Sequence, residues 1–151
     1  MVEEIHINLL VEYRNGRPLK EPVHVAHLQA NQYKLLYSPG LVQGIAAGDI
    51  FELINTNGEF NVISRSGNVS VQVYFRSPVL IGSTELIQQV EALNGSLDGS
   101  VQIGMVFSIP VSAGFEAIET IFNTFTNNNP EAKWFYGNVY DVNDNPLLWW
   151  E

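Results

Sequence analysis

The sequence predicts an α+β fold in which an antiparallel, barrel-like β-meander merges into a β-α-β-α-β sheet layer covered by two helices. Three observations support this prediction. Short apolar segments separated by turn signals fill the first half, two segments with helical spacing lie in the second half, and a long alternating segment separates those two. The 151 residues are expected to form a single domain, mainly strands over 1–76 and helix-strand-helix-strand plus an apolar C-terminal tail over 77–151.

Two Asn-Gly pairs mark turns between strands of the first half. Asn15-Gly16 follows the apolar residues 5–13, and Asn57-Gly58 lies between two apolar segments. Because Asn and Gly both tolerate positive φ, each pair predicts a two-residue hairpin. Further strands are expected over residues 23–28, 33–37, 50–55 and 69–75, with a loop rich in Gly and Pro between the second and third of them.

The apolar spacing changes after Ser77-Pro78. A helix is expected around residues 84–93, and a second one carries an apolar stripe through residues 115–125. Between them Val101, Ile103, Met105, Phe107 and Ile109 alternate over nine residues, which predicts one long strand that Pro110 ends. Residues 134–142 form an aromatic last strand, and a polar turn precedes the apolar tail 147–150. We interpret residues 78–82 as a change of pattern and not as a domain boundary.

Four segments, residues 23–28, 32–39, 44–50 and 64–71, follow one another in an order that is typical of a known family. They resemble the bacterial domain of unknown function numbered 4265, and the resemblance extends over residues 5–140. Where that family has a Ser-Gly-His turn, this chain has Ser66-Gly67-Asn68, so the potentially catalytic histidine is missing. Trp134-Phe135-Tyr136 matches the family's ending, but Gly137 replaces its acid. The resemblance implies a shared fold and no particular activity.

Charge and composition narrow the class of partner. Sixteen acidic residues against seven basic ones give a net charge of −9, which repels phosphate backbones and anionic membranes. We therefore expect no nucleic-acid and no membrane partner. The N-terminus is acidic where a signal peptide is basic, and no apolar run approaches the roughly 20 residues of a membrane span. The absence of cysteine excludes disulfides and fits a soluble, cytoplasmic protein.

No motif for catalysis or for cofactor binding is present. The glycines at 40, 44 and 48 precede Asp49, whereas a phosphate-binding loop continues with Lys-Ser or Lys-Thr. The three histidines, His6, His24 and His27, do not have the spacing of converging metal ligands. We therefore predict no catalytic residue, no cofactor and no metal, and an enzyme is the less favoured class.

Six residues are candidates for a binding surface. Arg65 and Asn68 lie in a turn and could bind a carboxylate or a peptide at the rim of a sheet, although a purely structural turn explains them as well. Trp134 and Tyr136 share one face of the last strand, where interface residues are often aromatic. Trp149 and Trp150 belong to the apolar tail, which is expected to dock either on its own sheet or on a second copy.

These observations favour a non-catalytic protein-interaction module, with a protein partner or self-association. An inhibitor or immunity-like protein that masks a basic partner, such as a nuclease toxin, is one concrete form of this hypothesis. The alternative is an unrecognised enzyme or small-ligand binder that uses a cleft beside the loop from Gly40 to Asp49.

Overall fold

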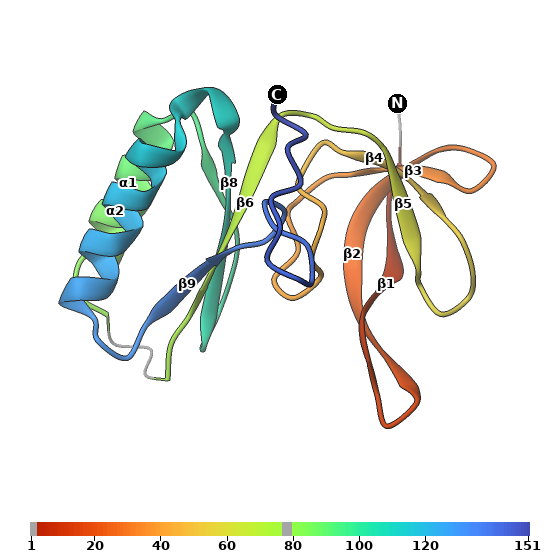
Figure 1. The fold of residues 1–151 in the computed structure, drawn as a ribbon, viewed down its shortest axis with the longest axis horizontal. Coiled ribbons are helices and arrows are strands. Elements are labelled where there is room, and N and C mark those ends of the chain that lie inside the picture. Colours follow the sequence, from red (N-terminus) through yellow and green to blue (C-terminus); the bar gives the residue numbers. More distant parts are fainter. Residues whose placement is uncertain (1–2, 77–79) are drawn as a thin grey trace.

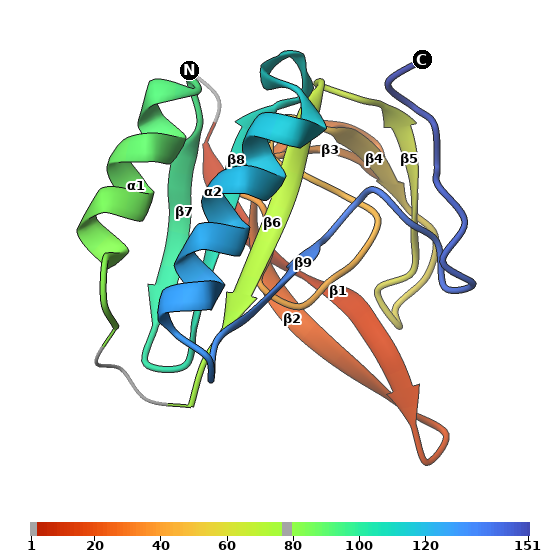
Figure 2. The same ribbon diagram turned by 60° about the vertical axis from the view of Figure 1, so that its left-hand side comes forward.

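The structure, a computed structural model, describes residues 3–76 and 80–151 and contains two antiparallel sheets and two helices (Figure 1). The α+β class is therefore confirmed. Both helices lie on the outer side of the second sheet, and the first sheet lies on its other side (Figures 1 and 2). The change of pattern expected at residues 78–82 falls partly outside the described residues.

The first sheet is a five-stranded meander with its strands in sequence order. Alternate residues face one apolar core, which includes Leu9, Val25, Leu35 and Phe51, all fully buried. The strands are β1 (Glu4–Arg14), β2 (Arg17–Gln29), β3 (Gln32–Leu35), β4 (Ile50–Leu53) and β5 (Phe60–Ser64).

The two Asn-Gly pairs differ in structure. Asn15 and Gly16 have φ of 53° and 76° and join β1 to β2 as the predicted two-residue hairpin. Gly58 also has positive φ, 88°, but its turn is longer than two residues because β4 ends at Leu53 and β5 begins at Phe60. The longer turn reaches β1, where the Gly58 carbonyl accepts the Leu10 N–H at 2.9 Å. The Tyr13 hydroxyl of β1 also donates to Glu59 of this turn at 2.5 Å, but the five described strands do not close into a barrel.

The second sheet has the strand order β7-β8-β6-β9, and its apolar face packs against the two helices. Alternate β6 residues Val69, Val71 and Val73 are fully buried there, together with Phe107 of β8 and Phe122 of α2. The elements are β6 (Asn68–Tyr74), α1 (Ser83–Ala92), β7 (Ser96–Val101), β8 (Gly104–Pro110), the short 3-10 helix η1 (Val111–Ala113), α2 (Phe115–Asn128) and β9 (Lys133–Tyr136).

The prediction of one long strand over residues 101–109 was wrong at its start. Val101 ends β7 and Ile103 lies in the β7–β8 turn, so these side chains are 68% and 61% exposed. β7 was missed because its sequence, Ser-Leu-Asp-Gly-Ser-Val, lacks apolar alternation and contains a bulge between Leu97 and Gly99. The last strand is also shorter than predicted and ends at Tyr136.

The contact between Gly58 and β1 leads to a stability prediction. A Cβ at Gly58 would lie 2.7 Å from the Leu10 nitrogen and 2.8 Å from the Asn8 oxygen, both backbone atoms. A Cβ at Gly16 would meet nothing within 4 Å, although φ is positive there too. Gly16→Ala should therefore cost only the left-handed strain, about 1–2 kcal/mol, and Gly58→Ala about 1–3 kcal/mol more. Urea denaturation measures both, and equal midpoints would contradict the contact.

Candidate functional site

The second sheet is polar on the face that is turned away from the helices. Ser70, Gln72 and Ser108 are buried there, and the latter two contact the loop of residues 36–49, here called the linking loop, which joins β3 to β4. The Gln72 amide nitrogen donates to the Pro39 carbonyl at 3.0 Å, and the hydroxyls of Ser38 and Ser108 lie 2.6 Å apart. Because buried polar groups are costly without partners, these bonds fix the linking loop between the two sheets.

Glu21 of β2 holds the beginning of this loop. Its carboxylate accepts the backbone N–H groups of Gly40, Leu41 and Val42, each at 2.9 Å. On the opposite side the Tyr74 hydroxyl donates to the Gly40 carbonyl at 2.5 Å. Both sheets therefore bind the same short backbone segment. Glu21 was not predicted as a site residue, because an acid inside a strand carries no signal of the loop that folds over it.

Asp49, at the end of the linking loop, is a fully buried carboxylate. One of its oxygens accepts the Ala46 N–H at 3.0 Å, and the other accepts the Ser66 N–H at 2.9 Å. The Arg65 guanidinium lies 3.4 Å from the first oxygen and donates to the Gly44 carbonyl at 2.8 Å. Burial raises the pKa of Asp49, and hydrogen bonds from Ser66 and Ala46 with the charge of Arg65 partly oppose that rise.

Arg65, in the turn after β5, and Asn68, the first residue of β6, both contact the linking loop. The Asn68 amide nitrogen donates to the Ala47 carbonyl at 2.9 Å, as does the Ser66 hydroxyl at 2.6 Å. Both predicted rim residues therefore have partners within the chain, and burial lowers the pKa of Arg65 although Asp49 counteracts this. A carboxylate-binding role for Arg65 and Asn68 stays a prediction and would require an exchange of these bonds.

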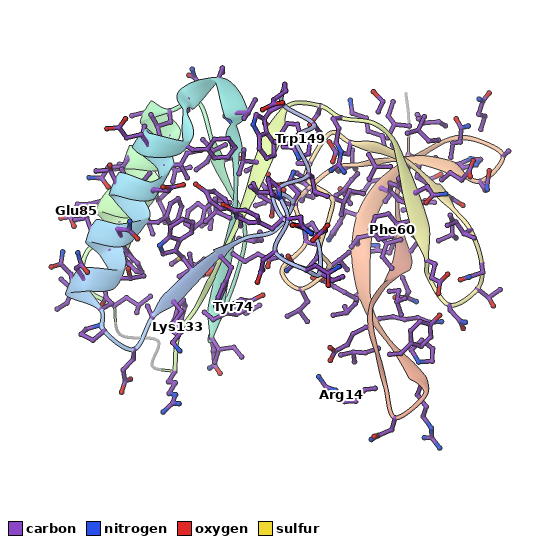
Figure 3. All side chains as sticks on the ribbon, in the orientation of Figure 1. Arg14, Phe60, Tyr74, Glu85, Lys133 and Trp149 are labelled. Atoms are coloured by element: carbon purple, nitrogen blue, oxygen red, sulfur yellow. The ribbon has the colours of Figure 1, made fainter. Side chains whose placement is uncertain are left out.

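A cleft of about 400 Å³ opens beside the start of the linking loop. Its walls come from β2, from residues 37–41, from the end of β6 and from the β7–β8 hairpin. The alternative hypothesis expected a cleft beside the loop from Gly40 to Asp49. Gly40 and Leu41 do line the cleft, whereas Val42, Ile45, Ala46, Ala47 and Asp49 of that loop are buried. Tyr74, labelled in Figure 3, projects from the sheet on the side away from the helices.

Trp134 and Tyr136 lie together on β9, as predicted, and both pack against α2. The Trp134 indole donates to the Asn123 side chain at 2.9 Å, and the Tyr136 hydroxyl donates to Glu119 at 2.7 Å. Burial and the hydrogen bond to Glu119 raise the pKa of Tyr136. The exposed aromatic of this strand is Phe135, half exposed on the opposite face, which the sequence analysis did not select.

The apolar tail contacts its own chain. The Trp149 indole donates to the Asn138 carbonyl at 2.8 Å and stacks under the Arg65 guanidinium at 5.8 Å (Trp149 is labelled in Figure 3). Trp150 packs edge-on against Phe115 of α2, with 5.1 Å between ring centroids. Of the two alternatives the structure therefore shows docking within the chain, against Asn138 and the start of α2.

The histidines separate into two groups. His6 and His24 are paired across β1 and β2 with ring centroids 4.1 Å apart, whereas His27 binds the Ala30 carbonyl at the hairpin end. Within residues 3–76 and 80–151, no group of three or more His, Asp or Glu side chains could hold a metal ion. No helix in these residues is long and apolar enough to span a membrane.

Negative charge is concentrated in the second half. Residues 80–151 contain nine acidic side chains and one basic one, Lys133, and so carry eight of the nine net negative charges. Neither helix contains Lys, Arg or His, and Glu85, Glu91 and Glu116 are exposed on them. A shallow groove lies between the helices, with Ala92, Ala117 and Thr120 among its lining residues. We call α1, α2 and this groove the helical layer.

The family described as "Domain of unknown function (DUF4265)" matches residues 21–133. The chain belongs to the DUF4265 family. Within the matched residues lie both the linking loop with Asp49 and the helical layer. The match confirms the resemblance seen in the sequence, over a shorter span than residues 5–140. No curated protein sequence matches this DUF4265 protein.

A hypothetical protein from Neisseria gonorrhoeae, described as a novel crystal structure, has a similar fold. The two structures align with a TM-score of 0.66 over 91% of this chain and 94% of that one, at 13% sequence identity. At this identity the likeness shows the fold alone. The arrangement of two sheets is therefore not peculiar to this DUF4265 member.

Asp49→Asn tests the buried carboxylate. An amide has one acceptor oxygen where the carboxylate has two, so an N–H of Ala46 or Ser66 loses its partner, at a cost of about 2–4 kcal/mol. Burial raises the folded pKa of Asp49 above its unfolded value of about 3.9. At a pH between these two pKa values, the carboxylate of Asp49 therefore takes up a proton when the wild-type protein folds. Its stability advantage over Asp49→Asn should therefore grow as pH falls from 7 through the folded pKa.

Asp141→Asn is the matched control. Backbone N–H groups of Asn145 and Asn143 lower the pKa of Asp141, which is exposed. Its contribution is therefore lost as pH falls through the folded pKa, the opposite trend. Chemical denaturation at a series of pH values measures both differences, and parallel trends would contradict the assignment of Asp49.

Truncation after Asp144 tests the tail. Loss of Trp149 and Trp150 should lower stability by about 2–4 kcal/mol, since two large side chains lose their partly buried contacts. Light scattering should give an unchanged assembly state, because the tail docks on its own chain. Val142→Ala, at a side chain that is 98% exposed in the same segment, should have no effect. Loss of a dimer upon truncation would instead show docking between copies.

Proposed function

We propose that this DUF4265 protein is a non-catalytic interaction module whose helical layer binds a basic protein partner. The carrying observation is the uneven charge: eight of the nine net negative charges belong to residues 80–151, and both helices lack basic residues. The negative electrostatic potential of these charges attracts a basic protein surface and raises the rate at which it associates.

The shape of the groove between the helices also supports the proposal. Its volume is about 650 Å³, and the small side chains of Ala92, Ala113 and Ala117 let a partner approach the helix backbones. Glu116 lines the groove itself. A partner with an apolar segment flanked by Lys or Arg fits this surface, and an inhibitor or immunity-like role toward a basic nuclease is one form of such binding. The proposal takes the chain as a single domain acting in the cytoplasm.

Photo-crosslinking in the producing cell identifies the partner. A crosslinking amino acid replaces Gln89 or Thr120, which line the groove, and in a control it replaces Ile63, exposed on β5 of the other sheet. Mass spectrometry should find a protein with a basic surface from the groove positions and not from Ile63. The same adducts from all three positions, or acidic adducts alone, would contradict the proposal.

Charge reversal then tests the surface with the captured protein. Glu85→Lys, Glu91→Lys and Glu116→Lys together should weaken binding by at least about tenfold, because three pairs of opposite charges become repulsive. The control reverses Glu3, Glu4 and Glu12, three exposed acids at or just before β1, and changes net charge equally. Isothermal titration at two salt concentrations measures both. If both triple variants lost the same binding affinity, net charge alone would explain the binding, and the helical layer would not be the binding surface.

A further inference from the structure

The cleft beside the linking loop lies on the opposite side of the second sheet from the helical layer, so an inference about it does not rest on the proposed function. Its floor includes Val106 of β8 and the ring of Tyr74. Pro22 and Val23 of β2 form the facing wall. At about 400 Å³ it is within the range of pockets that hold small molecules.

The mouth of the cleft is apolar and exposed. Tyr37 and Leu41 of the linking loop are 45% and 48% exposed, and Val101 and Ile103 of the β7–β8 hairpin are 68% and 61% exposed. Four large apolar side chains, two from the linking loop and two from the hairpin, therefore lie at one opening. Such clustered exposure commonly marks a binding site, since single exposed apolar residues need no explanation but a patch does.

The charged side chains in the walls of the cleft determine which ligand charge is favoured. Among the residues that line the cleft, within the described part of the chain, the acidic side chains are Glu21 and Asp98 and the basic one is the imidazole of His24, whereas Lys and Arg are absent. The Glu21 oxygens accept three backbone N–H groups. The Asp98 oxygens accept the Ser38 N–H at 2.8 Å and the hydroxyls of Ser96 and Ser108. These donors stabilise both charges, so the walls repel an anion.

We propose that this cleft binds a small, mainly aromatic or aliphatic molecule that carries no negative charge. The ligand would cover the apolar mouth and insert between β2 and the β7–β8 hairpin. The carboxylates, already hydrogen-bonded, would exclude anionic analogues and would favour a neutral or cationic group.

Two fluorescent probes with the same ring system test whether the cleft excludes negatively charged ligands. N-phenyl-1-naphthylamine is neutral, and its 8-sulfonate is an anion of nearly the same shape. The neutral probe should bind with one-to-one saturation, and the sulfonate should bind at least about tenfold more weakly. Failure of the neutral probe to saturate, or equal affinity for the two probes, would overturn the proposal.

A pair of variants tests the location. Val101→Glu adds a carboxylate at the mouth and should weaken binding of the neutral probe by at least about fivefold. Ile63→Glu makes a closely similar change at an exposed strand residue that does not line the cleft and should leave binding unchanged. Circular dichroism and thermal melting confirm that both variants are folded. Equal effects of the two variants would place the probe elsewhere and refute the proposal.

Discussion

The structure depends on the burial of a polar layer between its two sheets. The second sheet buries Ser70, Gln72 and Ser108 on one face, where Gln72 donates to the backbone of the linking loop and Ser108 contacts the Ser38 hydroxyl of that loop. Glu21 and Asp49 supply carboxylate acceptors at the two ends of that loop. Since a buried donor or acceptor without a partner costs about 1–3 kcal/mol, this layer permits few arrangements of the loop, and the loop in turn sets how the sheets lie against each other.

This constraint separates the surfaces that remain for function. The helices cover the apolar face of the second sheet and present an acidic outer layer, while the polar face is occupied by the linking loop except at the cleft. The C-terminal tail joins two further segments, because Trp149 contacts both Arg65 of the turn before β6 and Asn138 after β9. Arg65 and Trp149, two residues with the character of interface residues, thus stabilise the contact between parts of the same chain.

Local signals predicted the elements in which local and tertiary preferences agree. Asn15-Gly16 formed the expected two-residue hairpin, with open space where a Cβ at Gly16 would lie, whereas the turn of Asn57-Gly58 is longer and contacts β1. The helices were predicted from their apolar stripes, which face a large core. β7 escaped prediction because an edge strand with a bulge needs no alternation. The histidine pair was missed for a related reason: the register between strands, and not the spacing along one strand, placed His6 beside His24.

The sequence by itself determined the α+β class, the membership in a family, the acidic charge and most of the elements, because composition, periodicity and short turn motifs act over a few residues. Only the tertiary structure decided that the tail docks on its own chain, that Arg65 and Asn68 are held by the linking loop, and that an apolar cleft opens between β2 and the β7–β8 hairpin. Each of these depends on residues that are distant in the chain, and the hydrogen bonds of the buried polar layer bring those residues together.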